Sequence, residues 1–134
     1  MGIPIYHGVA ERLKFFKYEV STEETSILNY VTLKVISSIN NITNQHYTEE
    51  TLPDDLYSIA VDKTAGEFLL FKKNIGNLPE LDFSPLEKQV QMGDTSITYA
   101  VEEMTSPEEK IDKVIEFLIY SRDEELLRYR RLLW

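Results

Sequence analysis

Apolar residues recur at intervals of three or four positions over residues 22–44, and this spacing constrains the fold more than any other feature of the sequence. The recurring residues are Leu28, Val31, Val35, Ile39 and Ile42, with Ile27 and Ile36 beside them. Side chains at this spacing lie on one side of an α-helix. Ser21 and Glu24 have the spacing of a capping box at its start. The pattern predicts a long amphipathic helix over residues 22–44, whose apolar side other helices must cover.

A second long helix is predicted over residues 54–74. Asp54 and Asp55 fall at the positive end of its dipole, and Lys72 and Lys73 fall near the negative end. Its apolar residues are Tyr57, Ile59, Val61, Ala65, Phe68, Leu70 and Phe71. Because these side chains occupy most sides of the helix, we expect it to lie at the centre of a bundle.

Two further helices are predicted towards the ends of the chain, over residues 9–18 and 106–133. Ser106 suits the cap of the second of these, and Pro107 suits its first position. The apolar stripe of residues 106–133 is interrupted by the polar sequence SRDEE and then resumes. A single continuous helix is therefore expected to reach the C-terminal segment.

Over residues 87–101 the spacing of apolar residues changes from three or four positions to two. Lys88, Val90 and Met92 alternate with polar residues, as do Ile97 and Tyr99, and Gly-Asp lies between the two runs. This alternation predicts a β-hairpin. Residues 1–134 are therefore expected to form one mainly α domain, a small bundle of three to four helices, two of them long, with one inserted β-hairpin.

The composition narrows the class of function. The chain is 43% hydrophobic and 28% charged and has no cysteine, which predicts a soluble, cytoplasmic folded domain without disulfides. Its net charge is −9, and residues 1–127 contain 11 Lys and Arg against 23 Asp and Glu. Because binding to DNA depends on neutralising phosphates with cations, stable DNA binding by this acidic body is not expected.

Residues for catalysis or metal binding do not converge in the sequence. His7 and His46 are the two histidines, and no cysteine accompanies them. Paired carboxylates such as Glu124 and Glu125 are adjacent in sequence, so they do not face one another on a helix. The five glycines are scattered, so no phosphate-binding loop is formed. We expect no enzyme activity, no metal and no cofactor.

The C-terminal segment RYRRLLW contains three arginines, a tyrosine and the one tryptophan of the chain. These side chains could simply pack the last turn of the final helix, with the arginines extending past them. Tryptophan, tyrosine and arginine are also the residues enriched at the hot spots of protein interfaces. From composition alone the two interpretations have equal weight.

Four segments, in this order, resemble head–tail connector proteins of tailed bacteriophages and prophages, the adaptor or head-completion family. The segments are INNITNQ at residues 39–45, LPDDLYSIAVDKTAGEFL at residues 52–69, MGDTSITYA at residues 92–100 and RYRRLLW at residues 128–134. The resemblance implies a small helical adaptor that assembles as a ring of about twelve copies under the portal. Such a ring lies in the virion neck, extends the DNA channel and presents a platform to the next neck or tail protein.

The resemblance also implies which residues contact partners. The C-terminal segment would reach the portal protein, with the arginines binding its acidic groups and the apolar residues acting as anchors. These portal-binding residues are Arg128, Tyr129, Arg130, Arg131, Leu132, Leu133 and Trp134. A weaker candidate, for contact with a neighbouring copy or the channel, is the predicted hairpin turn. It comprises Gly93, Asp94, Thr95 and Ser96, for which a solvent-exposed turn is an equal alternative.

Two alternative functions remain open at the level of sequence. The first is another neck component, a head-closure or stopper protein. The second is a small cytoplasmic helical regulator that binds its partner through the C-terminal helix. Before assembly a connector would be found in the host cytoplasm, and DNA would pass through its ring without specific binding.

Overall fold

The computed structural model describes residues 4–78 and 107–130, and this part of the chain is mainly helical, as predicted. The helices are α1 (Ile5–Lys14), α2 (Thr25–Thr43), α3 (Asp54–Asn74), α6 (Pro107–Tyr120) and α7 (Asp123–Leu127), and a short 3-10 helix (Thr22–Glu24) precedes α2. The hairpin predicted over residues 87–101 lies outside the described residues.

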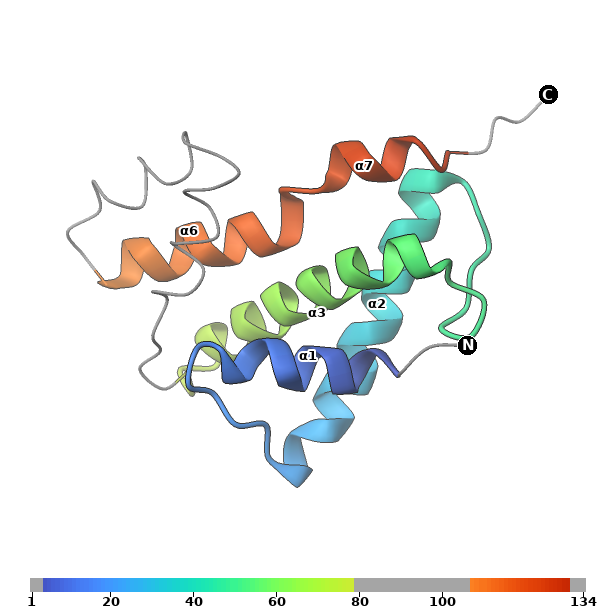
Figure 1. Ribbon diagram of the computed structural model, residues 1–134. Coiled ribbons are helices and arrows are strands. Elements are labelled where there is room, and N and C mark those ends of the chain that lie inside the picture. Colours follow the sequence, from blue (N-terminus) through green and yellow to red (C-terminus); the bar gives the residue numbers. More distant parts are fainter. Residues whose placement is uncertain (1–3, 79–106, 131–134) are drawn as a thin grey trace.

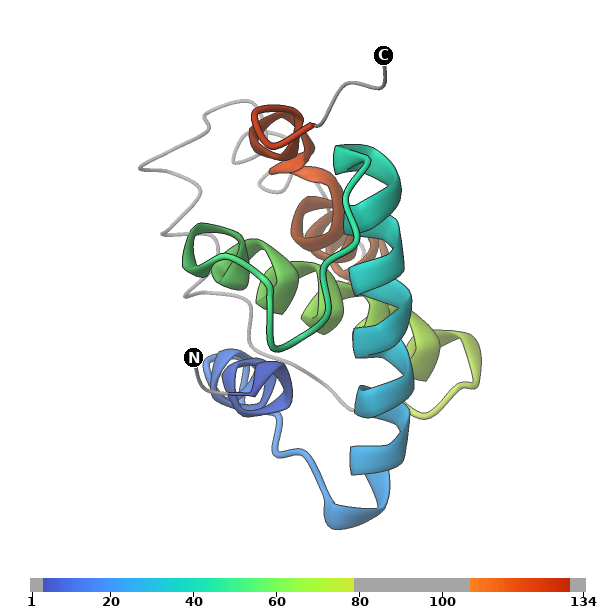
Figure 2. The same ribbon diagram turned by 90° about the vertical axis from the view of Figure 1, so that its right-hand side faces the viewer.

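Helix α3 lies at the centre of the bundle, as its sequence predicts. It runs between α1 and α6, and α2 crosses it on a third side (Figures 1 and 2). Its fully or almost fully buried apolar residues are Leu56, Ile59, Ala60, Ala65, Phe68 and Leu69. The predicted bounds, residues 54–74, agree with the observed helix. The core of the protein is therefore built around this helix.

Helix α2 buries the apolar stripe that defined it in the sequence. The buried residues are Leu28, Val31, Val35, Ile36 and Ile39. At its start the Glu24 carboxylate accepts a hydrogen bond from the Ser21 main-chain N–H at 3.0 Å, as expected for a capping box. Its first turn is 3-10, so the α-helix itself begins at Thr25. Asn44 adopts the left-handed conformation, with φ of 55°, and ends the helix.

Helix α1 does not have the predicted bounds of residues 9–18, because it begins at Ile5 and ends at Lys14. Pro4, with φ of −53°, precedes the first turn. The helix ends because Lys17 takes the left-handed conformation, with φ of 65°. The Tyr18 N–H then donates to the Leu13 carbonyl at 3.1 Å, which closes a Schellman motif without a glycine.

The single helix predicted over residues 106–133 is also corrected. Helix α6 ends at Tyr120, and a second, short helix α7 begins at Asp123 and ends at Leu127. Arg122 between them has φ of −113° and ψ of 17°, outside the helical region. Leu126 of α7 is completely buried, and α7 packs against α2. The break therefore redirects the end of the chain onto the bundle.

Helices α3 and α6 approach closely at Gly66. A Cβ atom built on Gly66 would lie 2.7 Å from Cγ1 of Ile119 and 2.9 Å from Cβ of Leu118. Ordinary carbon–carbon contacts are about 3.5–4.0 Å. Because Gly66 has no side chain, α3 and α6 can pack this closely at residue 66.

Candidate functional site

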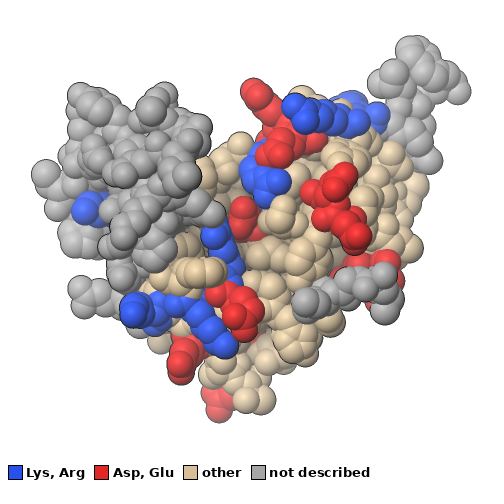
Figure 3. All heavy atoms as spheres, viewed as in Figure 1, with Lys and Arg blue, Asp and Glu red and all other residues tan. Residues whose placement is uncertain are grey.

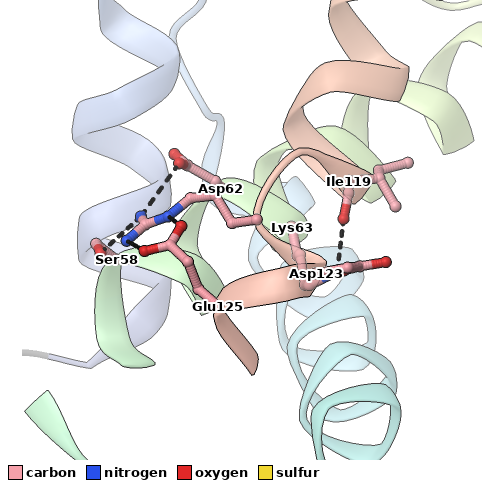
Figure 4. Close-up of polar contacts among 7 residues, drawn as sticks. Ser58, Asp62, Lys63, Ile119, Asp123 and Glu125 are labelled. Atoms are coloured by element: carbon pink, nitrogen blue, oxygen red, sulfur yellow. Dashed lines mark hydrogen bonds and ion pairs between the residues drawn. The ribbon is translucent and has the colours of Figure 1, made fainter. Parts of the chain in front are cut away.

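The break between α6 and α7 is held by Lys63, a buried lysine of α3 (Figure 4). Its Nζ donates a hydrogen bond to the Ile119 carbonyl at 2.6 Å and also to Oδ1 of Asp123. The carbonyl belongs to the last turn of α6, where main-chain acceptors have no partner within the helix. Asp123 is the first residue of α7. Lys63 therefore provides a hydrogen-bond donor for a main-chain carbonyl at the end of α6 and fixes the first residue of α7.

Arg122 provides a second attachment for the break (Figure 4). Its Nε and Nη2 atoms donate to both carboxylate oxygens of Glu125, at 2.7 and 3.3 Å, and its Nη1 donates to Oγ of Ser58 at 2.8 Å. The hydrogen bond from Arg122 lowers the pKa of the Glu125 carboxyl. This planar, bidentate geometry is specific to arginine. It fixes the first turn of α7 on α3.

Asp62 of α3 joins this attachment to α1. Its carboxylate lies 3.1 Å from Nε of Arg12 and 3.8 Å from Nη1 of Arg122. Burial raises the pKa of Asp62 even though both guanidinium groups oppose that change. Helices α1, α3 and the α6–α7 break are therefore connected through one carboxylate.

Tyr129 fixes the start of the C-terminal segment. Its side chain is half-buried against the core, and its hydroxyl donates to Oδ2 of Asp55 at 3.1 Å. Its main-chain carbonyl accepts a hydrogen bond from Nε2 of Gln45 at 3.1 Å. The sequence predicted Tyr129 as a portal contact, and the structure gives it contacts with α3 and the α2–α3 loop of its own chain. Its role towards a partner stays a prediction.

Arg128 and Arg130, on either side of Tyr129, are exposed. Figure 3 shows Lys and Arg side chains gathered over the C-terminal end of α7, with Asp and Glu side chains over its start. Leu127 next to them is 54% exposed. The described part of the C-terminal segment thus presents two cations to solvent, next to the exposed Leu127 of α7. The remaining predicted portal contacts, Arg131, Leu132, Leu133 and Trp134, lie outside the described residues, as do Gly93, Asp94, Thr95 and Ser96.

A second polar cluster lies at the other end of α3. Glu24 Oε2 accepts a hydrogen bond from the Tyr18 hydroxyl at 2.5 Å and pairs with the buried Lys72 Nζ at 2.6 Å. Burial acts to raise the pKa of Glu24, but the hydrogen bonds from Lys72, Tyr18 and Ser21 outweigh it and lower the pKa to about 2. A groove of about 650 Å³ lies beside this cluster. Because Lys72 is paired with Glu24, the cluster joins α2 to α3.

Neither histidine lies in a cluster of metal-binding side chains. His46 is exposed in the loop after α2, and His7 stacks on Tyr6 with ring centroids 4.2 Å apart. Within residues 4–78 and 107–130, no group of three His, Asp or Glu side chains could hold a metal ion. The same residues include no helix with the length and apolar character that a membrane span requires.

No protein-family model, curated protein or solved structure matches the chain. The geometry of the C-terminal segment and the ordered sequence resemblance therefore supply the basis for a functional proposal.

Proposed function

We propose that the chain is a structural adaptor of a phage or prophage particle, which assembles as a ring under the portal, extends the DNA channel and joins head to tail. The observation that carries the proposal is the cationic segment after α7, with Arg128 and Arg130 exposed and Tyr129 bound to the bundle between them. The resemblance of four segments to head–tail connectors supports it. The function is assembly, without catalysis.

The start of the C-terminal segment is fixed at Tyr129, and this favours docking on a protein partner. Asp55 and Gln45 hold Tyr129, so Arg128 and Arg130 on either side of it have a defined position on the bundle. A pre-positioned segment loses less conformational entropy on binding than a free one. Arg128, Arg130 and Arg131 then bind acidic groups of the portal, and Leu132, Leu133 and Trp134 supply apolar contacts.

The charge of the body suits a conduit for DNA. Residues 1–127 carry 23 acidic residues against 11 basic ones. Contact between such a surface and DNA neutralises few phosphates and releases few counterions, so DNA passes without being retained. The cations that would bind a protein partner are concentrated at the C-terminal segment. They are therefore separate from the acidic surface that DNA would pass.

The proposal is tested by reversing the charge of the segment while keeping its root. The double variant R128E/R130E should stay folded, because both side chains are exposed. It should fail to join portal-bearing heads in an in vitro assembly assay. The matched control is Lys14→Glu, which reverses another exposed cation, on α1. If R128E/R130E completes infectious particles as the wild type does, the role proposed for the segment is wrong.

Native mass spectrometry, with and without portal protein, separates this proposal from the alternatives. A connector forms a ring in the mixture that contains portal. A chain that forms no ring in that mixture favours another neck component, such as a head-closure protein. A discrete dimer that persists at low protein concentration and is indifferent to portal favours the helical regulator. Genome position adds a further check, since a connector gene should follow the portal, protease and major capsid genes.

A further inference from the structure

The outer side of α2 has few charged side chains and two large exposed apolar ones. Tyr30 and Leu33 are 68% and 67% exposed, the highest values among large apolar side chains in the described part of the chain. They lie three positions apart, so they are neighbours on one side of the helix. The other exposed residues of this α2 face are Ser26, Asn29, Lys34, Ser37, Ser38 and Asn41.

Carboxylates are missing from this stretch of an otherwise acidic sequence. The chain contains 23 Asp and Glu, yet residues 25–48 contain none, and Lys34 is their one Lys or Arg. Lys34 Nζ is paired with Glu67 of α3 at 3.2 Å. The centres of protein interfaces are depleted of charged residues and enriched in tyrosine. The α2 face shares the shortage of charged residues and has an exposed tyrosine, Tyr30, whereas its serines are typical of any protein surface.

We propose that the α2 face is where a second copy of this chain binds. Two copies each carry a net charge of −9 and repel one another, so a contact between them is least unfavourable where few carboxylates meet. Helix α2 contributes no carboxylate to this face, and the Glu67 carboxylate of α3 beside it is paired with Lys34. Its serine, asparagine and tyrosine groups both donate and accept hydrogen bonds, so they can pair with the polar groups of another copy without ions.

The association is weak in the free protein, because only two large apolar side chains stand at the centre of the face. A ring under the portal would bring copies together at a high local concentration, with the α2 face of one copy against a different surface of the next. The inference does not depend on the portal, however. Its failure would leave the role of the C-terminal segment untouched, and loss of portal binding would leave the α2 contact untouched.

The test is sedimentation equilibrium of the full chain over a wide range of concentration. Wild type should self-associate at high concentration, and Leu33→Glu should weaken this association by at least about thirtyfold, as for loss of an interface hot spot. Leu33 is mostly exposed and glutamate is a good helix former, so the variant should fold. The matched control, Phe15→Glu, adds the same charge at a side chain that is 59% exposed on another surface. It should associate as wild type does.

A second measurement reports on the face without disturbing its centre. The chain has no cysteine, so Ser37→Cys and Glu11→Cys each create one thiol, on the α2 face and on α1 respectively. Maleimide labelling of Cys at residue 37 should slow as protein concentration rises, and labelling at residue 11 should not. A wild type that is monomeric at every concentration, or equal association of L33E and F15E, would overturn the proposal.

Discussion

Lys63 of α3 donates a hydrogen bond to the main-chain carbonyl of Ile119, in the last turn of α6, at 2.6 Å. The lysine is 4% exposed, and it also binds Asp123 at the start of α7. Lys63 and Ile119 lie 56 positions apart in the sequence. Their contact therefore fixes where α6 ends, and it directs α7 onto α2.

Replacement of this lysine should destabilise the fold. Lys63→Met leaves the Ile119 carbonyl and the Asp123 carboxylate without their common donor, and we expect the free energy of unfolding to fall by about 2 kcal/mol. Urea unfolding followed by circular dichroism measures the change. Lys14→Met, at an exposed lysine, is the control and should change stability by less than about 0.5 kcal/mol. Equal stability of the two variants would contradict the role given to Lys63.

Acid should weaken the protein through Glu24. Its folded pKa of about 2 lies below the ordinary 4.5, so its contribution to stability is complete above about pH 4.5 and is lost as the pH falls towards 2. Allowing for solvent screening, this contribution is about 2 kcal/mol. Glu24→Gln should lower stability at neutral pH and flatten its fall in acid. Glu23→Gln, at the exposed neighbouring residue, should keep the acid dependence of wild type, and the two pH profiles of unfolding would show the difference.

Gly66→Ala should destabilise the protein although alanine is the better helix former. The added Cβ would lie 2.9 Å from Cβ of Leu118, an atom that moves only with its backbone. Overpacking typically costs about 1–3 kcal/mol, which exceeds the gain of about 1 kcal/mol in helix propensity. Thermal unfolding should show a lower midpoint. Ser37→Ala on the exposed side of α2 serves as the control for propensity alone, and a higher midpoint for Gly66→Ala would show that the helices can separate freely.

Tyr129→Phe should loosen the root of the C-terminal segment without unfolding the bundle. The variant loses the hydrogen bond to Asp55 and keeps the main-chain bond from Gln45. Global stability should change by less than about 0.5 kcal/mol, because the hydroxyl is near solvent. Hydrogen exchange of the amides of residues 126–130 should become faster. Asp55→Asn, which keeps the size of the partner, should give a smaller effect, and unchanged exchange in Tyr129→Phe would show that Asp55 does not hold the segment.

Helix bounds were predicted correctly where residues at the ends of the helix itself indicate them. The bounds of α3 were predicted because Asp54 and Asp55 stand at one end and Lys72 and Lys73 at the other. The end of α1 was missed because a lysine, Lys17, holds a conformation for which glycine is the usual marker.

Features set by distant residues could not be predicted. The α6–α7 break depends on Lys63, and the position of Tyr129 depends on Gln45 and Asp55. Because these partners are distant in the sequence, no local pattern predicts either feature. Arg128 and Arg130 of the C-terminal segment are exposed. Its function towards a portal stays a prediction.

The central position of α3 has a consequence for biosynthesis. The ribosome synthesises α1, α2 and α3 before α6, yet α6 packs along one side of α3. Until residues 107–120 have been translated, that apolar side is open to water and to other nascent chains. The bundle can therefore close only after residues 107–120 have been synthesised, and during this interval the unfinished polypeptide is a natural client for chaperones.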